Sequence, residues 1–456
     1  MNLESRKREL FKEFAPRLET TSILSKIYMG SLIVIILVGL YAFYLQMSEG
    51  QIVTGMRDNV VWGIYEVNFI LLVCISYSGA FISGILHFFH TPWKTAIARI
   101  VEIITVLSLL IGPIYILLCM GRLDRLHYLF MYPRIQSPIT WDIMAIITDI
   151  VACFIYLYLT FIPDFAILRD HCEERNIPKW IKKMYKTLAI GYQDTKTQRD
   201  RLHKITRTMS AMVIVLAIVA YSVLAWIFSL TLQPGWNSTI FAPYFIVGGL
   251  FSGVAFIIIT MYLVRKFYKL EKYIRRMHFK VGGIILLILA MFYGYFTFTE
   301  YFSRWFSHRA IDTNLLDKLF TRYFWEFILA NYVGILVPIG ILFFKKFRTI
   351  NWVTIAAVIA LVGVWLNRYL IVIPTLETPY VPIQDTRIDY IFYSASWVEI
   401  TLSIAGIAAF LLMFTLIGKI VPLVPMNYIL DGRSTPKTVK KKDNKKYQSN
   451  NNLEEL

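Results

Sequence analysis

The chain has 456 residues, of which 57% are hydrophobic and 17% are charged. A soluble domain carries about a quarter charged residues, so this composition excludes a water-soluble globular protein and indicates a chain whose main solvent is lipid. The formal net charge of +17 does not indicate nucleic-acid binding, because the basic residues lie between apolar runs rather than on one amphipathic face.

Ten segments have the length and apolar character that an α-helix needs to cross the hydrocarbon core of a bilayer. In chain order they are residues 27–46, 61–89, 96–119, 141–162, 207–231, 240–264, 281–303, 323–344, 352–373 and 396–418. The sequence therefore predicts an all-α polytopic membrane protein with ten transmembrane helices. A segment of residues 1–26 precedes this membrane domain, 27–418, and a basic tail of residues 419–456 follows it.

The lysines and arginines between the spans alternate between two sides. Of the 47 in the chain, 36 lie on the side of the N-terminal segment, many of them in the basic 163–206 loop and the tail, and nine lie on the opposite side. By the positive-inside rule, both termini are expected in the cytoplasm. The tail is polar and rich in Lys and Asn after Asp431, and it is predicted to be largely disordered.

The 163–206 loop contains a short basic amphipathic segment, Trp180 to Tyr185. Such a segment is typical of a helix that lies on the membrane surface. We expect it on the inner membrane face, and this interpretation is favoured over a specific partner site.

Ionisable side chains within the spans are costly in lipid, so each is expected to face protein or water and is a functional candidate. Toward the outer side the sequence places Glu66, Asp142, Asp149, Glu300, Glu326, Arg368 and Glu399. Toward the inner side it places His87, His90, Arg99 and Glu102.

Asp142 and Asp149 are seven residues apart, which puts them on one helix face, about 10 Å apart along the axis. They can form an inward ladder of proton acceptors. Asp142 also has a structural interpretation, because Ser137-Pro138 just before it is typical of a helix start. Both interpretations remain open.

Two arginines lie within the spans. Arg99 and Glu102 are three residues apart and can pair on one helix face, either as a structural salt bridge or as a step in an inner proton path. Arg368, with Asn367 beside it, is expected to neutralise one of the outer carboxylates.

Neither cysteines nor histidines form a recognisable cofactor motif. The four cysteines are far apart and make no C-x-x-C spacing, and the histidines lie in loops or near inner span ends rather than facing each other within the membrane. The chain is therefore expected to hold no metal and no haem of its own, and any such group is expected in a partner protein.

Several motifs then suggest a family. They are Met120-Gly121-Arg122, Ser137 to Asp142, Phe161-Ile162-Pro163-Asp164-Phe165, Pro234-Gly235-Trp236 and Trp365-Leu366 followed by Arg368-Tyr369. Together they resemble the NrfD/PsrC family of quinone-interacting membrane subunits, and within it they are most similar to the ActC subunits of bacterial alternative complex III.

The resemblance implies a ten-helix subunit with two four-helix bundles plus flanking helices, in a bacterial inner membrane. It implies the quinol-oxidising or quinone-reducing subunit of a multi-subunit respiratory oxidoreductase, with menaquinone as the expected quinone near the outer face. The implied partners are a peripheral iron–sulfur subunit that exchanges the electrons, a multihaem cytochrome and other membrane subunits.

The candidate site residues follow from the resemblance and from the charges inside the membrane. Asp142 and Arg122 are the expected catalytic pair, and Trp141, Cys119 and Trp236 are expected to bind the quinone. The expected proton path includes Asp149, Glu66, Glu300, Arg368, Glu399, Arg99, Glu102 and His87.

The chain departs from the family pattern at three positions. Cys119 stands where the family commonly has His, Ile227 where it has an acidic residue, and Asn367 where Trp-Leu-Glu-Arg has Glu. These departures leave open a structural or proton-translocating paralogue without quinone chemistry. A stand-alone secondary transporter is less favoured, because no internal repeat is visible.

Overall fold

The computed structural model describes residues 3–19, 22–89, 97–174, 177–379 and 392–430. All regular secondary structure in those ranges is helical, and ten helices are long and apolar enough to cross a membrane. They are α2 (Ile23–Glu49), α3 (Gly63–Phe88), α4 (Ala98–Cys119), α6 (Pro138–His171), α8 (Lys196–Ser229), α9 (Phe241–Phe267), α10 (Arg276–Ser307), the composite span Phe324–Phe343, α14 (Ile350–Leu376) and α16 (Trp397–Ile420). The all-α, ten-span prediction is confirmed.

The composite span consists of α12 (Phe324–Phe327), the π-helical η5 (Ile328–Leu336) and α13 (Val337–Phe343). Short helices connect or flank the spans: α1 (Leu3–Glu19), η1 (Gln51–Val53), η3 (Leu123–Arg125), α5 (Tyr128–Met131), η4 (Cys172–Glu174), α7 (Lys179–Leu188), α11 (Ala310–Thr321), η6 (Lys345–Phe347) and α17 (Met426–Leu430).

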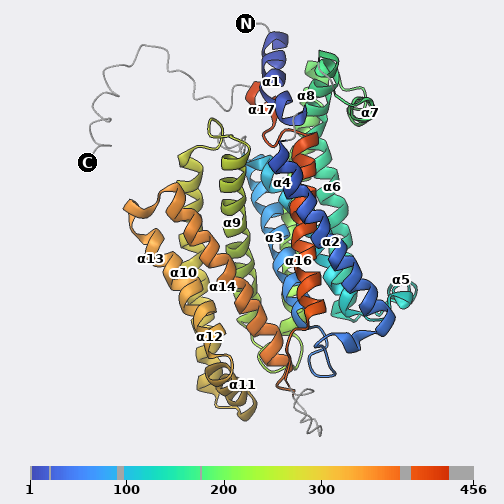
Figure 1. Cartoon of the computed structure of the whole chain (residues 1–456). Coiled ribbons are helices and arrows are strands. Elements are labelled where there is room, and N and C mark those ends of the chain that lie inside the picture. The colour runs from blue at the N-terminus through green and yellow to red at the C-terminus, as the bar shows by residue number, and fades with distance from the viewer. Residues whose placement is uncertain (1–2, 20–21, 90–96, 175–176, 380–391, 431–456) are drawn as a thin grey trace.

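The spans form two four-helix bundles that pack side by side. In bundle 1, α3 and α6 occupy opposite corners, and each packs against both α4 and α8. Bundle 2 consists of α9, α10, α14 and the composite span, and it meets bundle 1 mainly through α3 and α9. The remaining spans, α2 and α16, pack against each other and flank α4, as the resemblance implied (Figure 1).

The two ends of the described chain lie on the same face of the molecule. Helices α1, α7 and α17 gather there, and we call it the terminal face (Figure 1). Helices α5 and α11 lie at the opposite end, the far face (Figure 1). An even number of spans requires this arrangement, and the far face corresponds to the predicted outer side.

Two helices extend beyond their predicted spans on the terminal face. Helix α6 continues through Pro163 to His171, and α8 begins at Lys196 rather than near residue 207. Much of the predicted 163–206 loop is therefore helical. Residues 90–96 with His90, most of the predicted 374–395 loop, and the predicted disordered tail from residue 431 lie outside the described residues.

Large apolar side chains are exposed along the outside of the spans. Helix α2 is the clearest case, with Leu37 57% and Tyr41 58% exposed, and α10 presents Phe298 at 65%. In water such exposure would be unfavourable, whereas in a bilayer these side chains contact lipid tails. The pattern matches a multi-pass membrane protein in which only the bundle interiors are shielded from lipid.

In bundle 2, η5 and α14 approach each other so closely that only glycine fits at the contact. A Cβ atom on either Gly334 or Gly363 would overlap the Cα of the other. Close approach through small residues is a common means of helix packing in membranes.

We expect Gly363→Ala to destabilise the protein by about 1–3 kcal/mol, the usual cost of overpacking. The measurement is the thermal unfolding midpoint in detergent. Gly340→Ala is the matched control, because nothing lies within 4 Å of a Cβ at Gly340. Equal melting temperatures for the two variants would contradict the role of this contact.

Candidate functional site

A stripe of buried polar side chains runs along the face of α6 that points into bundle 1. Its members are spaced three, four or seven residues apart, which places them on one helix face. They are Asp142, Asp149, Cys153, Tyr156, Thr160 and Asp164, all at most 8% exposed. The predicted Asp142–Asp149 ladder is thus the far-face half of a longer stripe that crosses the bundle.

At the far end of bundle 1, Asp142 faces the interior together with Glu66 of α3. Glu66 is 6% and Asp142 8% exposed, and the two carboxyls lie within electrostatic range of each other. The Asp142 Oδ1 atom is buried without a hydrogen-bond partner, and the Glu66 carboxyl accepts no hydrogen bond from a described residue. A buried carboxyl oxygen without a protein partner is unusual and is available to a ligand, and the Glu66 carboxyl offers a second acceptor nearby.

The helix start does not account for Asp142. Ser137 is the N-cap and Pro138 opens the helix, so Asp142 lies beyond the first turn, which contains no acidic residue. The partial charge at a helix N-terminus falls off within that turn. The structure therefore does not support the helix-start interpretation, and the functional role of Asp142 stays a prediction.

Cys119 and two tryptophans surround the Glu66 corner. The Cys119 thiol lies 3.5 Å from the backbone oxygen of Trp62, one turn before Glu66. The Trp62 ring is parallel to that of Trp236, with an interplanar angle of 3° and 6.1 Å between centroids. Trp236 is anchored by its indole N–H, which donates to the Ile371 carbonyl at 2.6 Å. Cys119 thus lies near the start of α3, within electrostatic range of Glu66, and Trp62, which sequence reasoning missed, stacks on Trp236.

The Arg122 and Trp141 side chains form no hydrogen bond with Asp142 or Glu66 in the structure. Arg122 is exposed and forms a bidentate pair with Asp124, with bonds of 3.0 and 2.9 Å, and the hydrogen bond from Arg122 holds the pKa of Asp124 below its usual value. Trp141 is 38% exposed and donates to the Ile135 carbonyl. The expectation that Arg122 tunes Asp142 and that Trp141 walls the ring finds no contact in the structure.

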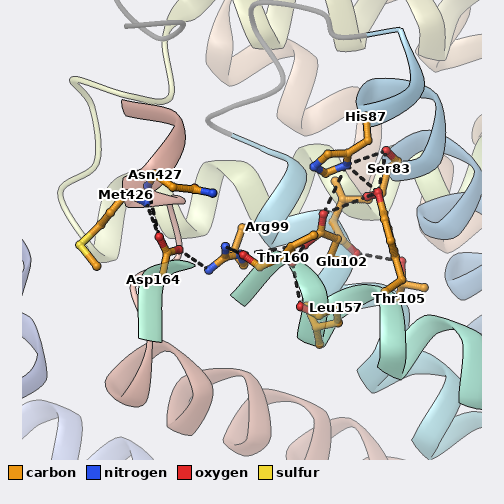
Figure 2. A network of polar contacts seen from close by, with 12 residues as sticks. Ser83, His87, Arg99, Glu102, Thr105, Leu157, Thr160, Asp164, Met426 and Asn427 are labelled. Carbon is orange, nitrogen blue, oxygen red and sulfur yellow. Dashed lines mark hydrogen bonds and ion pairs between the residues drawn. The ribbon is translucent and has the colours of Figure 1, made fainter. Parts of the chain in front are cut away.

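In the terminal half of bundle 1, Figure 2 shows a polar network that joins α3, α4 and α6. The Tyr156 hydroxyl lies 2.6 Å from Nδ1 of His87. Nδ1 of His87 is 3.5 Å from Glu102 Oε1, and Thr160 donates to Glu102 Oε2 at 2.7 Å. His87 and Glu102 were candidates from the sequence, whereas Tyr156 and Thr160 were not.

Arg99 has a closer carboxylate than the one predicted for it. Its Nη1 lies 2.9 Å from Asp164 Oδ2, and both side chains are completely buried. Its Nε is 3.9 Å from Glu102 Oε2, so the predicted pair exists but is the looser one. Asp164 Oδ1 also accepts from the backbone N–H groups of Met426 and Asn427 in α17 (Figure 2).

A second set of buried polar groups lies in the far half of bundle 2. Glu300 forms an ion pair with Arg304 one turn later and accepts a hydrogen bond from Ser238 at 2.8 Å. The Tyr244 hydroxyl donates to Asn367 Oδ1 at 2.6 Å, and the Asn367 amide donates to Asn331 at 3.2 Å.

Arg368 does not neutralise an outer carboxylate. Its Nη2 donates to the Phe245 carbonyl at 3.2 Å, and its guanidinium lies 4.2 Å from the centroid of the Phe245 ring. None of the ion pairs within the described residues includes it. The physical reason is that the side chain is directed to α9, where an aromatic face and a carbonyl replace a counter-ion.

Glu399 has a full set of structural contacts. It accepts hydrogen bonds from the Gly55 and Ser396 backbone N–H groups at 2.7 and 2.9 Å and from the Tyr393 hydroxyl at 2.6 Å. With Ser396 it forms the capping box of α16. These bonds fasten the start of α16 to the segment before α3, so Glu399 has less freedom to carry protons than Glu66 or Asp149.

No group of three or more His, Cys, Asp and Glu side chains in the described ranges is arranged to hold a metal ion.

The comparisons with known proteins agree with this architecture. A putative dimethyl sulfoxide reductase membrane subunit of Halobacterium salinarum is 27% identical over 253 residues, 55% of this chain, and the match spans about half, 54%, of that protein. A selenate reductase subunit of Mesobacillus selenatarsenatis is 21% identical over 416 residues, covering 88% of this chain and 95% of that protein. An Hdr-like menaquinol oxidoreductase integral membrane subunit of Archaeoglobus fulgidus is 22% identical over 403 residues, 85% and 90% of the two chains.

The family model described as "Polysulphide reductase, NrfD" matches residues 52–379. This match covers well over half of the chain and includes α3 through α14, the helices that form both bundles. The protein is therefore a multi-pass membrane protein of the NrfD family.

Proposed function

We propose that this chain is the quinone-interacting membrane subunit of a multi-subunit oxidoreductase, with its quinone site at the far end of bundle 1. The observation that carries the proposal is the Asp142 carboxyl, whose Oδ1 atom is buried without a hydrogen-bond partner, together with the largely buried side chain of Glu66 within electrostatic range of it. Quinol hydroxyls and quinone carbonyls are groups that such carboxyls bind, and an apolar, aromatic surround suits a substrate that arrives from lipid.

In the oxidation of a hydroquinone, two electrons and two protons must leave. Asp142 is placed to accept a proton as a general base, and Glu66 supplies a second carboxyl on the facing helix. Glu66 thereby compensates for the acidic residue that the family commonly has where this chain has Ile227. The stacked Trp62 and Trp236 rings are the proposed aromatic wall, since Trp62 lies one helical turn before Glu66. The electrons pass to an iron–sulfur chain in a partner, because the chain itself offers no cofactor motif.

The nature of the quinone and partners is a finer proposal. One matched relative is a menaquinol oxidoreductase subunit, which supports menaquinone here, and all three relatives are subunits of reductase or oxidoreductase systems. We propose a peripheral iron–sulfur subunit, a multihaem cytochrome and further membrane subunits as partners, in an assembly like alternative complex III, where the motifs resemble ActC.

Purification in a mild detergent tests this function as a whole. A protein that carries iron–sulfur clusters or haem should co-purify with the chain, and a short-chain menaquinol should reduce those centres, as followed by their absorbance or paramagnetic resonance. A preparation that contains the partner but whose centres stay oxidised with menaquinol, while dithionite reduces them, would contradict the proposal.

We place the far face outside a bacterial inner membrane and both termini in the cytoplasm, because 36 of the 47 basic residues lie on the terminal side. A cysteine at exposed His308, between α10 and α11, should react with an impermeant maleimide from outside intact cells. A cysteine at exposed Lys183 in α7 should react only after lysis. The reverse pattern would invert the orientation and the outer quinone site with it.

Proton conduction through bundle 1 is a second candidate function, and the α6 stripe favours it. The stripe extends from Asp142 to the His87–Glu102 network, and within it the Cys153 thiol lies 3.6 Å from Asp149 Oδ1. Among the described residues, the terminal half of bundle 2 has no such stripe, since its core positions there are mainly apolar residues such as Leu286, Val353 and Ala357. If protons cross this subunit, bundle 1 is the route that its side chains support.

A further inference from the structure

A cavity large enough for several water molecules opens on the terminal face beside the buried network of bundle 1. It holds about 50 Å³ of space that water molecules can occupy and lies between α6, α8, α1 and α17. Its polar lining includes Asp170, Asp194, His203 and Lys7. A single water needs roughly 10–15 Å³ of such space, so the cavity has room for about three waters among groups that hydrogen-bond to them.

Ion pairs connect three charged side chains that line the cavity. Lys7 of α1 lies 3.1 Å from Asp194, and Arg199 of α8 lies 3.0 Å from the other oxygen of the same carboxylate. The three side chains are only partly exposed, at 10%, 25% and 36% for Lys7, Asp194 and Arg199. Polar groups at the aqueous boundary of a membrane protein keep such a cavity wet rather than filled by lipid.

Thr160 connects the cavity to the buried polar network. Thr160 lines the cavity, and its hydroxyl donates to Glu102 Oε2 at 2.7 Å. Glu102 is completely enclosed, with Arg99, His87, Ser83 and Thr160 around its carboxyl. Thr160 is therefore a residue that the cavity lining and the hydrogen bonds of the buried carboxyl share.

The Thr160 hydroxyl has two acceptors for its one hydrogen, Glu102 Oε2 at 2.7 Å and the Leu157 carbonyl at 2.8 Å. With Glu102 ionised, the hydroxyl donates to the carboxylate. With Glu102 protonated, the carboxylic O–H can donate to the threonine oxygen while the hydroxyl turns to Leu157, since a hydroxyl offers one donor and two acceptor lone pairs. Apart from the proton on Glu102, the two states differ by a rotation of one side-chain O–H.

We propose that this cavity is the proton-exchange inlet of bundle 1 and that Thr160 relays protons between its water and Glu102. A hydronium ion in the cavity gives its proton to the threonine oxygen as the threonine proton passes to the carboxylate, leaving water and a neutral Glu102. The proposal rests on the proton-conduction part of the proposed function and names its entrance. The ligand of the site is water in its protonated form.

The Arg99–Asp164 pair fixes the geometry around Thr160. Arg99 donates to the Thr160 carbonyl at 2.8 Å while it pairs with Asp164. Asp164 in turn accepts a hydrogen bond at 3.2 Å from the backbone N–H of Asn427, another residue of the cavity lining. Arg99 is thus a positioning residue for Thr160 rather than a carrier of the proton.

Hydrogen–deuterium exchange of the Glu102 carboxyl tests the inlet. The full chain in lipid vesicles is moved from water to D₂O, at a pH where the carboxylic stretching band lost in Glu102→Gln is visible, and the shift of that band is timed by infrared spectroscopy. Thr160→Val keeps the side-chain shape but removes the hydroxyl. We expect it to slow the exchange on the order of 100-fold, the lower end of what a positioned proton-transfer group contributes.

Two matched variants separate the relay from a general effect on packing. Thr160→Ser keeps the hydroxyl and should exchange at nearly the parental rate. Thr206→Val removes another buried hydroxyl of the same cavity that does not reach Glu102, and it should leave the rate unchanged. Parental exchange in Thr160→Val, or equal slowing in all three variants, would overturn the proposal. The assay needs neither quinol nor partner, so its outcome is independent of the quinone chemistry.

Discussion

Replacing Asp142 by Asn should lower quinol-dependent reduction of the partner on the order of 100-fold while the complex remains assembled. This is the lower end of the contribution of a positioned acid–base group. The reason is that the Asp142 Oδ1 atom is buried without a protein partner, and an amide of the same shape cannot take the quinol proton. Cys119 in place of the family's His leaves few substitutes for it. The measurement is the steady-state rate of partner reduction by a menaquinol analogue.

Asp124→Asn is the matched control for this experiment. Asp124 is also a far-face carboxylate, but it is exposed and paired with Arg122, so its replacement should leave quinol turnover at the parental rate. If the assembled Asp142→Asn variant turns over quinol as fast as this control, Asp142 is a structural carboxylate. The interpretation of the subunit as a paralogue without quinone chemistry would then be the better one.

The second large effect is expected at Asp164. Asp164→Leu should destabilise the protein by about 3–5 kcal/mol, because it leaves the completely buried guanidinium of Arg99 without its closest counter-ion. The variant also removes the acceptor for the Met426 and Asn427 N–H groups, so α17 should detach from the terminal end of bundle 1. The measurements are the melting temperature in detergent and the yield of monodisperse protein on size exclusion.

The double variant Arg99→Met with Asp164→Leu separates the lost charge balance from a simple packing defect. Replacing both partners of a buried ion pair by apolar residues is often nearly neutral, so the double variant should recover much of the lost melting temperature. Part of the loss should remain, because the α17 amides still lack their acceptor. A double variant as unstable as Asp164→Leu would contradict the assignment of the cost to an unpaired Arg99.

The number and order of the spans could be predicted from the sequence because lipid leaves the backbone few choices. Every N–H and C=O group within the bilayer must be satisfied within the helix, so a long apolar run such as α2 has one stable outcome. The helix ends were less predictable. The predicted span ended at residue 162, yet α6 continues through Pro163 to His171 and so carries Asp164 to Arg99.

The candidate site could be predicted only in part, because its members meet across helices. The spacing of Asp142 and Asp149 revealed one half of the α6 stripe, and the same spacing rule applied further along α6 would have added Tyr156 and Thr160. That Glu66 faces Asp142 depends on the diagonal packing of α3 and α6, which no local pattern encodes. Arg122 was predicted to act on Asp142 because its motif lies near Asp142 in the sequence. In the structure, its guanidinium donates instead to both carboxylate oxygens of Asp124.

The most direct test of the central claim is a density map of the intact complex, purified with menaquinone in lipid nanodiscs. The account predicts a quinone ring at the far end of bundle 1, with one oxygen within hydrogen-bond distance of Asp142 and the other directed toward Glu66, and with the ring near Trp62 and Trp236. A map of the same quality that shows Asp142 and Glu66 bonded only to protein, and the quinone bound at another place, would contradict it.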